Sequence, residues 1–227
     1  MATNLDLEEQ EQLDQLKHFW KQYGNLITWL LIAVLGAYAA WNGWNWWQRQ
    51  QAAKASAIFD AAAEAVQRKD LAALDRSLSD LRSGHGSSAY ASQAALLAAK
   101  AYQDAGKNTE ALAALRWAAE QSGDPGHQAI ARLRWASLLA DAKSYDEALK
   151  VLSGSFPAGF DALASDRRGD VLMLTGKSAE ARAEFTKAWQ GMDATSDYRR
   201  IVEVKLNALG VDPAQSGAAA SGTGAKS

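Results

Sequence analysis

Cysteine is absent from this chain of 227 residues, and proline and histidine each occur only three times. Without cysteine, disulfide bonds and thiolate chemistry are excluded. None of His18, His85 and His127 has a second ligand at metal-site spacing, so the sequence predicts no metal. Lysine and arginine never form a run and the formal net charge is −2. Nucleic acid is therefore not an expected partner.

Signatures of catalysis are also scarce. The glycine-rich stretch Ser83–Ser88 is not followed by Lys-Ser/Thr and follows no predicted strand, so it is not a phosphate-binding loop. The carboxylates Asp161, Asp166 and Asp170 can face one another, but solvated helix faces explain them more simply. We therefore expect no catalytic residue, no cofactor and no enzymatic activity.

Signals for β-strands are nearly missing after Arg49. Valine and isoleucine are sparse there, no Asn-Gly hairpin turn occurs, and helix formers such as alanine dominate. The sequence therefore predicts an all-α fold.

The one long apolar stretch lies near the N-terminus, where no residue from Gln22 to Gln48 is charged. As a helix, Leu26 to Trp46 would be about 32 Å long, close to the ~30 Å hydrocarbon core of a bilayer. Aromatic residues gather at both of its ends, as expected where lipid meets water. These are Phe19, Trp20 and Tyr23 before it, and Trp41, Trp44, Trp46 and Trp47 after it. The pattern predicts one transmembrane helix in contact with membrane lipid.

This stretch has two other interpretations. The segment Ala37-Tyr38-Ala39 matches a signal-peptidase site, but the long acidic segment before the run departs from a signal peptide. A buried core helix would need apolar surroundings that the rest of the sequence does not supply. The flanking charges do not decide the orientation of this helix across the membrane, because the basic residues on the two sides nearly balance. They are Lys17 and Lys21 before the run, and Arg49 and Lys54 after it.

Small residues share one face of the apolar helix. Ala33, Gly36, Ala37 and Ala40 have the spacing that lets two membrane helices approach closely. They are candidate residues for packing within the membrane. Because alanine and glycine are also common in single anchors, a simple anchor is the favoured interpretation.

A pattern of about 34 residues returns after the apolar stretch. The best copies are Tyr102…Gly106…Ala111…Leu115…Ala118, Leu139…Lys143…Ala148…Leu152 and Leu172…Gly176…Ala181…Phe185…Ala188. A weaker copy, Phe59, Val66, Leu74 and Leu78, comes before them. This resembles the tetratricopeptide repeat, with one large residue closing each first helix and a small one letting the second cross it. The alternative is an irregular array of helical hairpins.

The sequence therefore predicts an N-terminal single transmembrane helix followed by a tetratricopeptide-like α-solenoid of helical hairpins. Residues 1–21 are expected to form an amphipathic segment, 22–48 the transmembrane helix, 49–209 the repeats, and 210–227 a disordered Gly/Ala/Ser tail. A last helix over about Ser196 to Leu209 should cap the stack with a polar back.

Stacked hairpins form a concave surface that binds peptides or partner proteins. In the register above, first-helix residues facing this surface are Lys100, Gln103, Asp104, Ser137, Asp141, Asp170 and Met173. They are the candidate protein-binding residues.

The N-terminal part also resembles a known family. The segment Glu8–Asn25, above all Phe19–Gly24, looks like the start of the YfgM family of Gram-negative bacteria, and the Trp-rich segment Trp41–Gln48 fits it too. The likeness covers about residues 5 to 209. It implies an ancillary subunit of the SecYEG translocon, in the inner membrane, with a cytoplasmic N-terminus and a periplasmic repeat domain.

The same resemblance implies association with the periplasmic foldase PpiD and assistance to newly exported proteins, with no catalytic residues. The alternative function is a membrane-anchored repeat scaffold for cell-envelope assembly, division or signalling. Orientation in the membrane separates the two, because a signalling scaffold would have its repeats on the cytoplasmic face.

Overall fold

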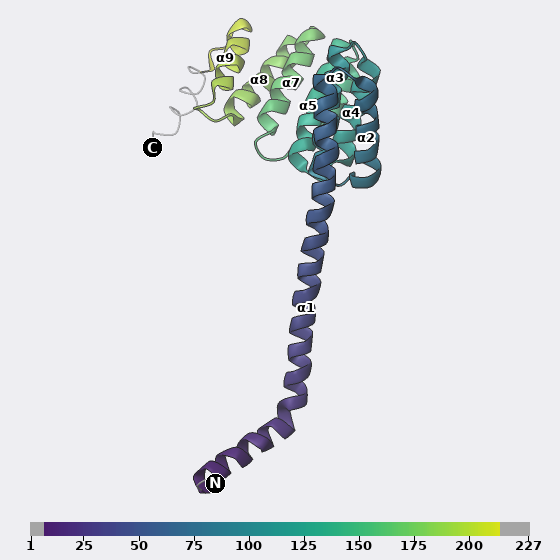
Figure 1. Cartoon of the computed structure of the whole chain (residues 1–227). Helices are drawn as coiled ribbons and strands as arrows, with labels where there is room; N and C mark the ends of the chain where they lie inside the picture. The colour runs from purple at the N-terminus through teal and green to yellow at the C-terminus, as the bar shows by residue number, and fades with distance from the viewer. Residues whose placement is uncertain (1–6, 214–227) are drawn as a thin grey trace, which may run out of the picture. The chain divides into compact units, whose positions relative to one another are not determined.

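A computed structural model describes residues 7–213 of the chain. Over this range the chain forms nine α-helices and no strand, which confirms the all-α prediction (Figure 1). Contacts divide the chain into two units, Met1–Ala53 and Lys54–Ser227. Helix α1, Leu7–Gln67, contributes residues to both. It runs without a break through the expected limits at 21/22 and 48/49, so those limits stay predictions.

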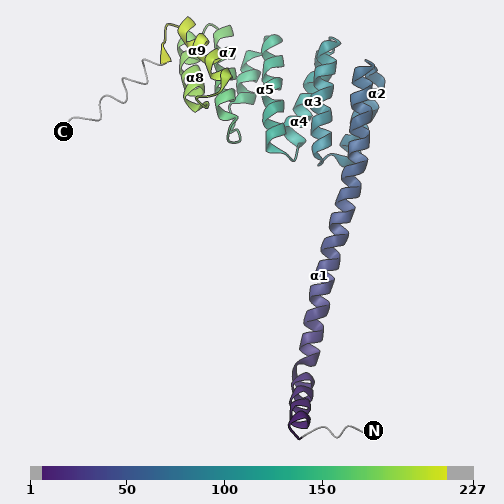
Figure 2. The ribbon, with the colours of Figure 1, turned by 60° about the vertical axis from the view of Figure 1, so that its left-hand side comes forward.

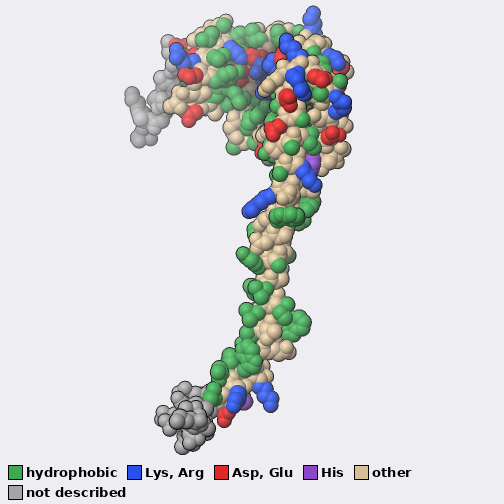
Figure 3. Space-filling view, in the orientation of Figure 1, with side chains coloured by type: hydrophobic (Ala, Val, Ile, Leu, Met, Phe, Trp, Pro, Cys, Tyr) green, Lys and Arg blue, Asp and Glu red, His purple; other side chains and the backbone are tan. Residues whose placement is uncertain are grey.

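The first unit consists of the N-terminal part of α1. Every Leu, Ile, Val, Trp and Tyr between Leu30 and Trp47 is exposed, and Figure 3 shows hydrophobic side chains along this part of the helix. Only 6% of its most apolar membrane-length window is buried. This contradicts a core helix, because such a helix would be covered by other elements, and it leaves one helix suited to crossing a membrane in the described range.

The second unit is a series of antiparallel helices in chain order (Figure 2). After the end of α1 come α2 (Leu71–His85), α3 (Ala89–Asp104), α4 (Asn108–Gln121), α5 (Pro125–Asp141), α6 (Tyr145–Leu152), α7 (Asp161–Leu174), α8 (Ser178–Gly191) and α9 (Asp197–Ala208). The loops before α3 and α5 supply the N-terminal caps of these helices. Ser88 and Asp124 accept from the backbone N–H three residues on, at 3.2 and 2.7 Å, which satisfies helix N–H groups that would otherwise lack acceptors.

One turn geometry recurs through this unit. A residue with positive φ follows the first helix of each hairpin, at Lys69, Gly106, Lys143, Gly176 and Gly210. The next N–H then donates to the carbonyl five residues earlier, as in Lys107 to Tyr102 at 2.8 Å and Val211 to Leu206 at 3.0 Å. This is the Schellman ending of a helix. The turns lie 37, 37, 33 and 34 positions apart, so the weaker first copy shares the register and a fifth turn follows α9.

The C-terminal tail that the sequence predicts begins at this fifth turn. Gly210 has φ +75°, and Val211 packs against the buried cluster that contains Leu206. Residues 214–227 lie outside the described range, so the expectation for them stays a prediction.

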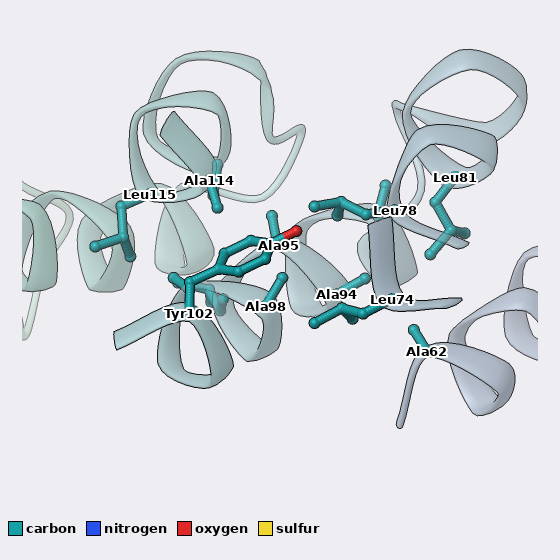
Figure 4. Close-up of a cluster of buried hydrophobic side chains, with 14 of the residues drawn as sticks. Ala62, Leu74, Leu78, Leu81, Ala94, Ala95, Ala98, Tyr102, Ala114 and Leu115 are labelled. Carbon is teal, nitrogen blue, oxygen red and sulfur yellow. The ribbon is translucent and has the colours of Figure 1, made fainter. Parts of the chain in front are cut away.

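Each hairpin has a small residue in its first helix and a large residue in its second helix, sixteen positions later. The pairs are Ala62 and Leu78, Ala99 and Leu115, Ala136 and Leu152, and Gly169 and Phe185, and all eight residues are buried. Figure 4 shows Ala62, Leu78 and Leu115 within the cluster of the first hairpins. A small first partner lets the helices approach, and a large second partner fills the space between them. Where the small partner is glycine, the large one is phenylalanine.

Replacing Lys143 by glycine is expected to stabilise the repeat unit. Lys143 has φ +60°, a left-handed conformation that costs a residue with a Cβ about 1 kcal/mol. Glycine adopts this conformation freely, so Lys143→Gly should raise the midpoint of thermal unfolding by about 2–4 °C. Circular dichroism of the full chain in detergent measures this shift.

The matched control for this change is Gly176→Ala at the equivalent turn, where φ is +77°. It should lower the midpoint by a similar amount. An unchanged or lowered midpoint for Lys143→Gly would contradict the strain assigned to this turn.

Candidate interaction surface

The predicted binding residues lie on α3, α5 and α7, which are the first helices of three successive hairpins. Lys100, Ser137 and Asp170 each lie six positions before a positive-φ residue. Lys100 is exposed and donates to both oxygens of Asp104 at 2.6 and 2.9 Å. Ser137 is half-buried, and its hydroxyl donates to the carbonyl of Leu133 at 3.0 Å.

The remaining predicted residues lie at the ends of the same helices. Gln103, Asp104, Asp141 and Met173 come two or three positions before the turns and are all exposed. These side chains are therefore accessible to a partner. We define the predicted groove as these four residues together with Lys100, Ser137 and Asp170.

Asp170 differs from the others because a neighbouring helix engages it. Lys205 of α9 lies 2.7 Å from an oxygen of Asp170 and 2.7 Å from an oxygen of Asp166. Burial raises the pKa of Asp170, and the hydrogen bond from Lys205 offsets part of that rise. Asp170 is thus half-buried and paired within the unit.

Asp166 is the buried carboxylate beside Lys205, and its position was wrongly predicted from the sequence. Asp166 is 1% exposed, so the interpretation of it as part of a solvated face is wrong. Tyr198 donates to it at 2.8 Å and Lys205 at 2.7 Å. Burial and the bond to Asp166 raise the pKa of Tyr198 to about 12, so the phenol remains a donor near neutral pH. These contacts hold α9 against α7.

Two exposed apolar residues of α9 lie at positions equivalent to positions on α7. Ile201 and Val204 of α9 lie nine and six positions before the turn at Gly210, equivalent to Arg167 and Asp170 of α7. They are 50% and 66% exposed, although both are large and apolar. The sequence predicted a polar back for this helix, and these exposed apolar side chains contradict that prediction. The signal that could have found them was Gly210, which lies one repeat period after Gly176.

A cavity of about 690 Å³ lies between α4, α5 and α6. Several of its charged groups already have partners. Arg116 pairs with Glu120 at 2.9 Å, and the Arg132 guanidinium donates to the carbonyls of Val151 and Ser155 at 2.8–3.2 Å. Among the described residues no group of three or more His, Asp or Glu could hold a metal ion. Exposed side chains on successive first helices, rather than a chemical centre, are thus the main candidate for function.

Comparisons with known proteins give a consistent result. The profile of the tetratricopeptide repeat-like domain matches residues 17–211. An ancillary SecYEG translocon subunit of Neisseria gonorrhoeae is 32% identical over 206 residues, covering 89% of this chain and 98% of the relative. Proteins of the same name from Haemophilus influenzae and Escherichia coli are 29% and 26% identical, again across 89% of this chain and nearly all of the relative.

One apolar helix of membrane length, together with stacked tetratricopeptide-like hairpins, defines a membrane-associated repeat protein of the protein-interaction class. Similarity to three like-named proteins over nearly their whole length narrows this class further. The chain belongs to the YfgM family, as the residues around Phe19 indicated.

Proposed function

We propose that this protein is a non-enzymatic ancillary subunit of the SecYEG translocon that binds other proteins through its repeats. The observation that carries the proposal is the extent of the similarity. The three relatives named for this role match through both the apolar helix and the repeats. The exposed residues on successive first helices support it, because such stacks bind extended segments of partner proteins.

In this proposal the protein crosses the inner membrane once, with residues 22–48 in the bilayer and the repeats of 49–209 in the periplasm. The family resemblance supports this orientation, which the flanking charges leave open. It also supports PpiD and exported chains as partners. A periplasm-dependent reporter enzyme fused after Leu209 should be active, and an inactive but stable fusion would contradict the orientation.

In this proposal the membrane helix is first of all an anchor, and its small face is the candidate position for a second contact. Ala33, Gly36, Ala37 and Ala40 are all exposed, and a Cβ added to Gly36 would meet no atom within 4 Å. These small residues would let another helix approach closely within lipid.

Substituting the predicted groove should weaken partner binding without unfolding the repeats. Gln103, Asp141 and Met173 are exposed on three different helices. Their joint replacement by alanine should weaken capture of translocon partners from solubilised membranes by about tenfold or more, the effect of losing one or two interface hot spots. Quantitative pull-down with the full chain measures the loss.

The matched control replaces Arg76, Asp80 and Gln190, which are exposed on α2 and α8, by alanine. Capture by this variant should stay unchanged, and both variants should keep the helical signal of the wild type. Equal capture by the groove variant and the wild type would refute the placement of the binding surface.

A further inference from the structure

Arg82 on α2 carries buried polar atoms without an acceptor. Its guanidinium carbon lies 4.9 Å from the centre of the Trp117 ring on α4. Its Nε and Nη2 atoms are buried, and neither has a hydrogen-bond partner among residues 7–213. Arg82 therefore keeps unused donors in a partly buried position.

Such an arrangement is unfavourable unless something supplies an acceptor. Arginine stays charged at every ordinary pH, and a buried N–H without a partner loses its hydrogen bonds to water. The face of Trp117 stabilises the charge, but it accepts no hydrogen bond from the N–H groups, which point outward in the plane of the guanidinium. Burial lowers the pKa of Arg82, as expected where a charge loses contact with water.

A cavity of about 410 Å³ lies beside this side chain. Arg82 lines it together with Asp75, Leu78, Ser79, Ser83 and Tyr102. The one carboxylate in the lining, Asp75, accepts a short hydrogen bond from the Tyr102 hydroxyl. The cavity wall thus contains a guanidinium whose Nε and Nη2 lack acceptors. It also contains the Ser79 hydroxyl, which can donate to an anion, and the Ser83 hydroxyl, which donates to the Asp80 carbonyl at 3.3 Å.

We propose that this Arg82 pocket binds a carboxylate group of a polypeptide. The planar guanidinium matches the two oxygens of a carboxylate, and a carboxylate entering the cavity can turn the free N–H groups toward itself. One arginine suits a single negative charge. A phosphate dianion would face Asp75 with only one cation to offset it. The carboxylate can come from a chain terminus or from an Asp or Glu side chain.

Three short peptides test the pocket and distinguish the two sources. The first is acetyl-Ala-Ala-Gln-Ala-Ala with a free C-terminal carboxylate, the second acetyl-Ala-Ala-Glu-Ala-Ala-amide, and the third the neutral acetyl-Ala-Ala-Gln-Ala-Ala-amide. Saturation-transfer NMR with the full chain in a non-ionic detergent measures their dissociation constants. At least one carboxylate peptide should bind, and the stronger of the two identifies the source. Binding of neither, or equal binding of the neutral peptide, would overturn the proposal.

Two substitutions in the pocket should change the affinity for a carboxylate in opposite directions. Arg82→Gln should weaken carboxylate binding by more than about tenfold, as expected for a lost charged hydrogen bond. Asp75→Asn should strengthen it, since a negative charge leaves the cavity. Arg76→Gln, which changes an exposed arginine of the same helix, should have no effect. Wild-type affinity in Arg82→Gln would refute the pocket.

Two further measurements keep the result decisive. Arg82→Lys keeps the charge but loses the planar fork, so it should bind the carboxylate peptide more weakly than the wild type. This comparison stands even if the glutamine variant does not fold, and wild-type affinity in a folded Arg82→Lys would refute the pocket. Inorganic phosphate should compete with the peptide less well than acetate, and the reverse order would refute a carboxylate site. Because no membrane partner takes part, this outcome does not depend on the translocon proposal.

Discussion

Replacing Gly169 by alanine should lower the free energy of unfolding of the repeat unit by about 1–2 kcal/mol. A Cβ at this position would lie only 2.5 Å from the Phe185 ring, so helix α7 or the ring must move. Overpacking of a core costs about 1–3 kcal/mol, and the better helix propensity of alanine returns about 0.5–1 kcal/mol. The net effect is a loss of stability, although glycine is the poorer helix former.

The other hairpins show how the loss can be reversed. At the equivalent positions, Ala99 and Ala136 are paired with Leu115 and Leu152. Phe185→Leu alone should cost about 1–2 kcal/mol because it leaves a cavity beside glycine. Combined with Gly169→Ala, it rebuilds the alanine–leucine pair of the neighbouring hairpins. The double variant should therefore be more stable than the sum of the two single changes predicts.

Urea unfolding of the four proteins, followed by circular dichroism, gives the coupling between these positions. We expect a coupling of at least about 1 kcal/mol in favour of the double variant. Strict additivity of the two losses would show that the ring and the backbone do not limit each other. The pairing rule for the hairpins would then be wrong.

Removing the Lys205 ammonium should destabilise the C-terminal end of the repeat unit by about 2–4 kcal/mol. In Lys205→Met the carboxylate of Asp166, which is 1% exposed, would keep only Tyr198 as a partner. Breaking a buried pair from one side leaves an uncompensated charge and typically costs about 3–5 kcal/mol. Lys205 itself is 25% exposed, so water reduces this cost.

Hydrogen exchange locates the effect of this change, since it reports opening of single helices. Amides of α9 should exchange faster in Lys205→Met, while those of α3 and α4 keep wild-type protection. Adding Asp166→Asn should restore part of the stability, because the unpaired charge is then gone. The control is Lys100→Met, which breaks an exposed pair with Asp104 and should cost less than about 1 kcal/mol. Equal losses at both sites would contradict the buried role of Asp166.

The hairpins could be predicted because their determinants are local. Turn glycines at Gly106 and Gly176, and alanines five positions later, follow from backbone geometry and close helix crossing. The repeat register is kept even at Lys143, which stands where other repeats have glycine, because tertiary packing imposes the left-handed conformation on this lysine. A pattern of this kind is visible in one sequence.

The polar contacts could not be predicted in the same way. Lys205 meets Asp166 across 39 positions, and Tyr102 meets Asp75 across 27. These contacts depend on which faces two separate helices present to each other, and no spacing rule encodes that. For the same reason the sequence placed Asp166 in solvent and missed Val204. The long apolar helix could be predicted because length and lack of charge suffice to identify a candidate membrane span.

The central claim is that the exposed faces of successive first helices bind partners at the translocon. Site-specific photocrosslinking in intact membranes tests it most directly, with a photoreactive amino acid at Lys100, Asp141 or Val204 and, as controls, at Arg76 or Gln190. We predict that translocon subunits or exported chains are recovered from the first three positions and not from the controls. Recovery of cell-wall or signalling proteins instead, or equal yields from both sets of positions, would contradict the claim.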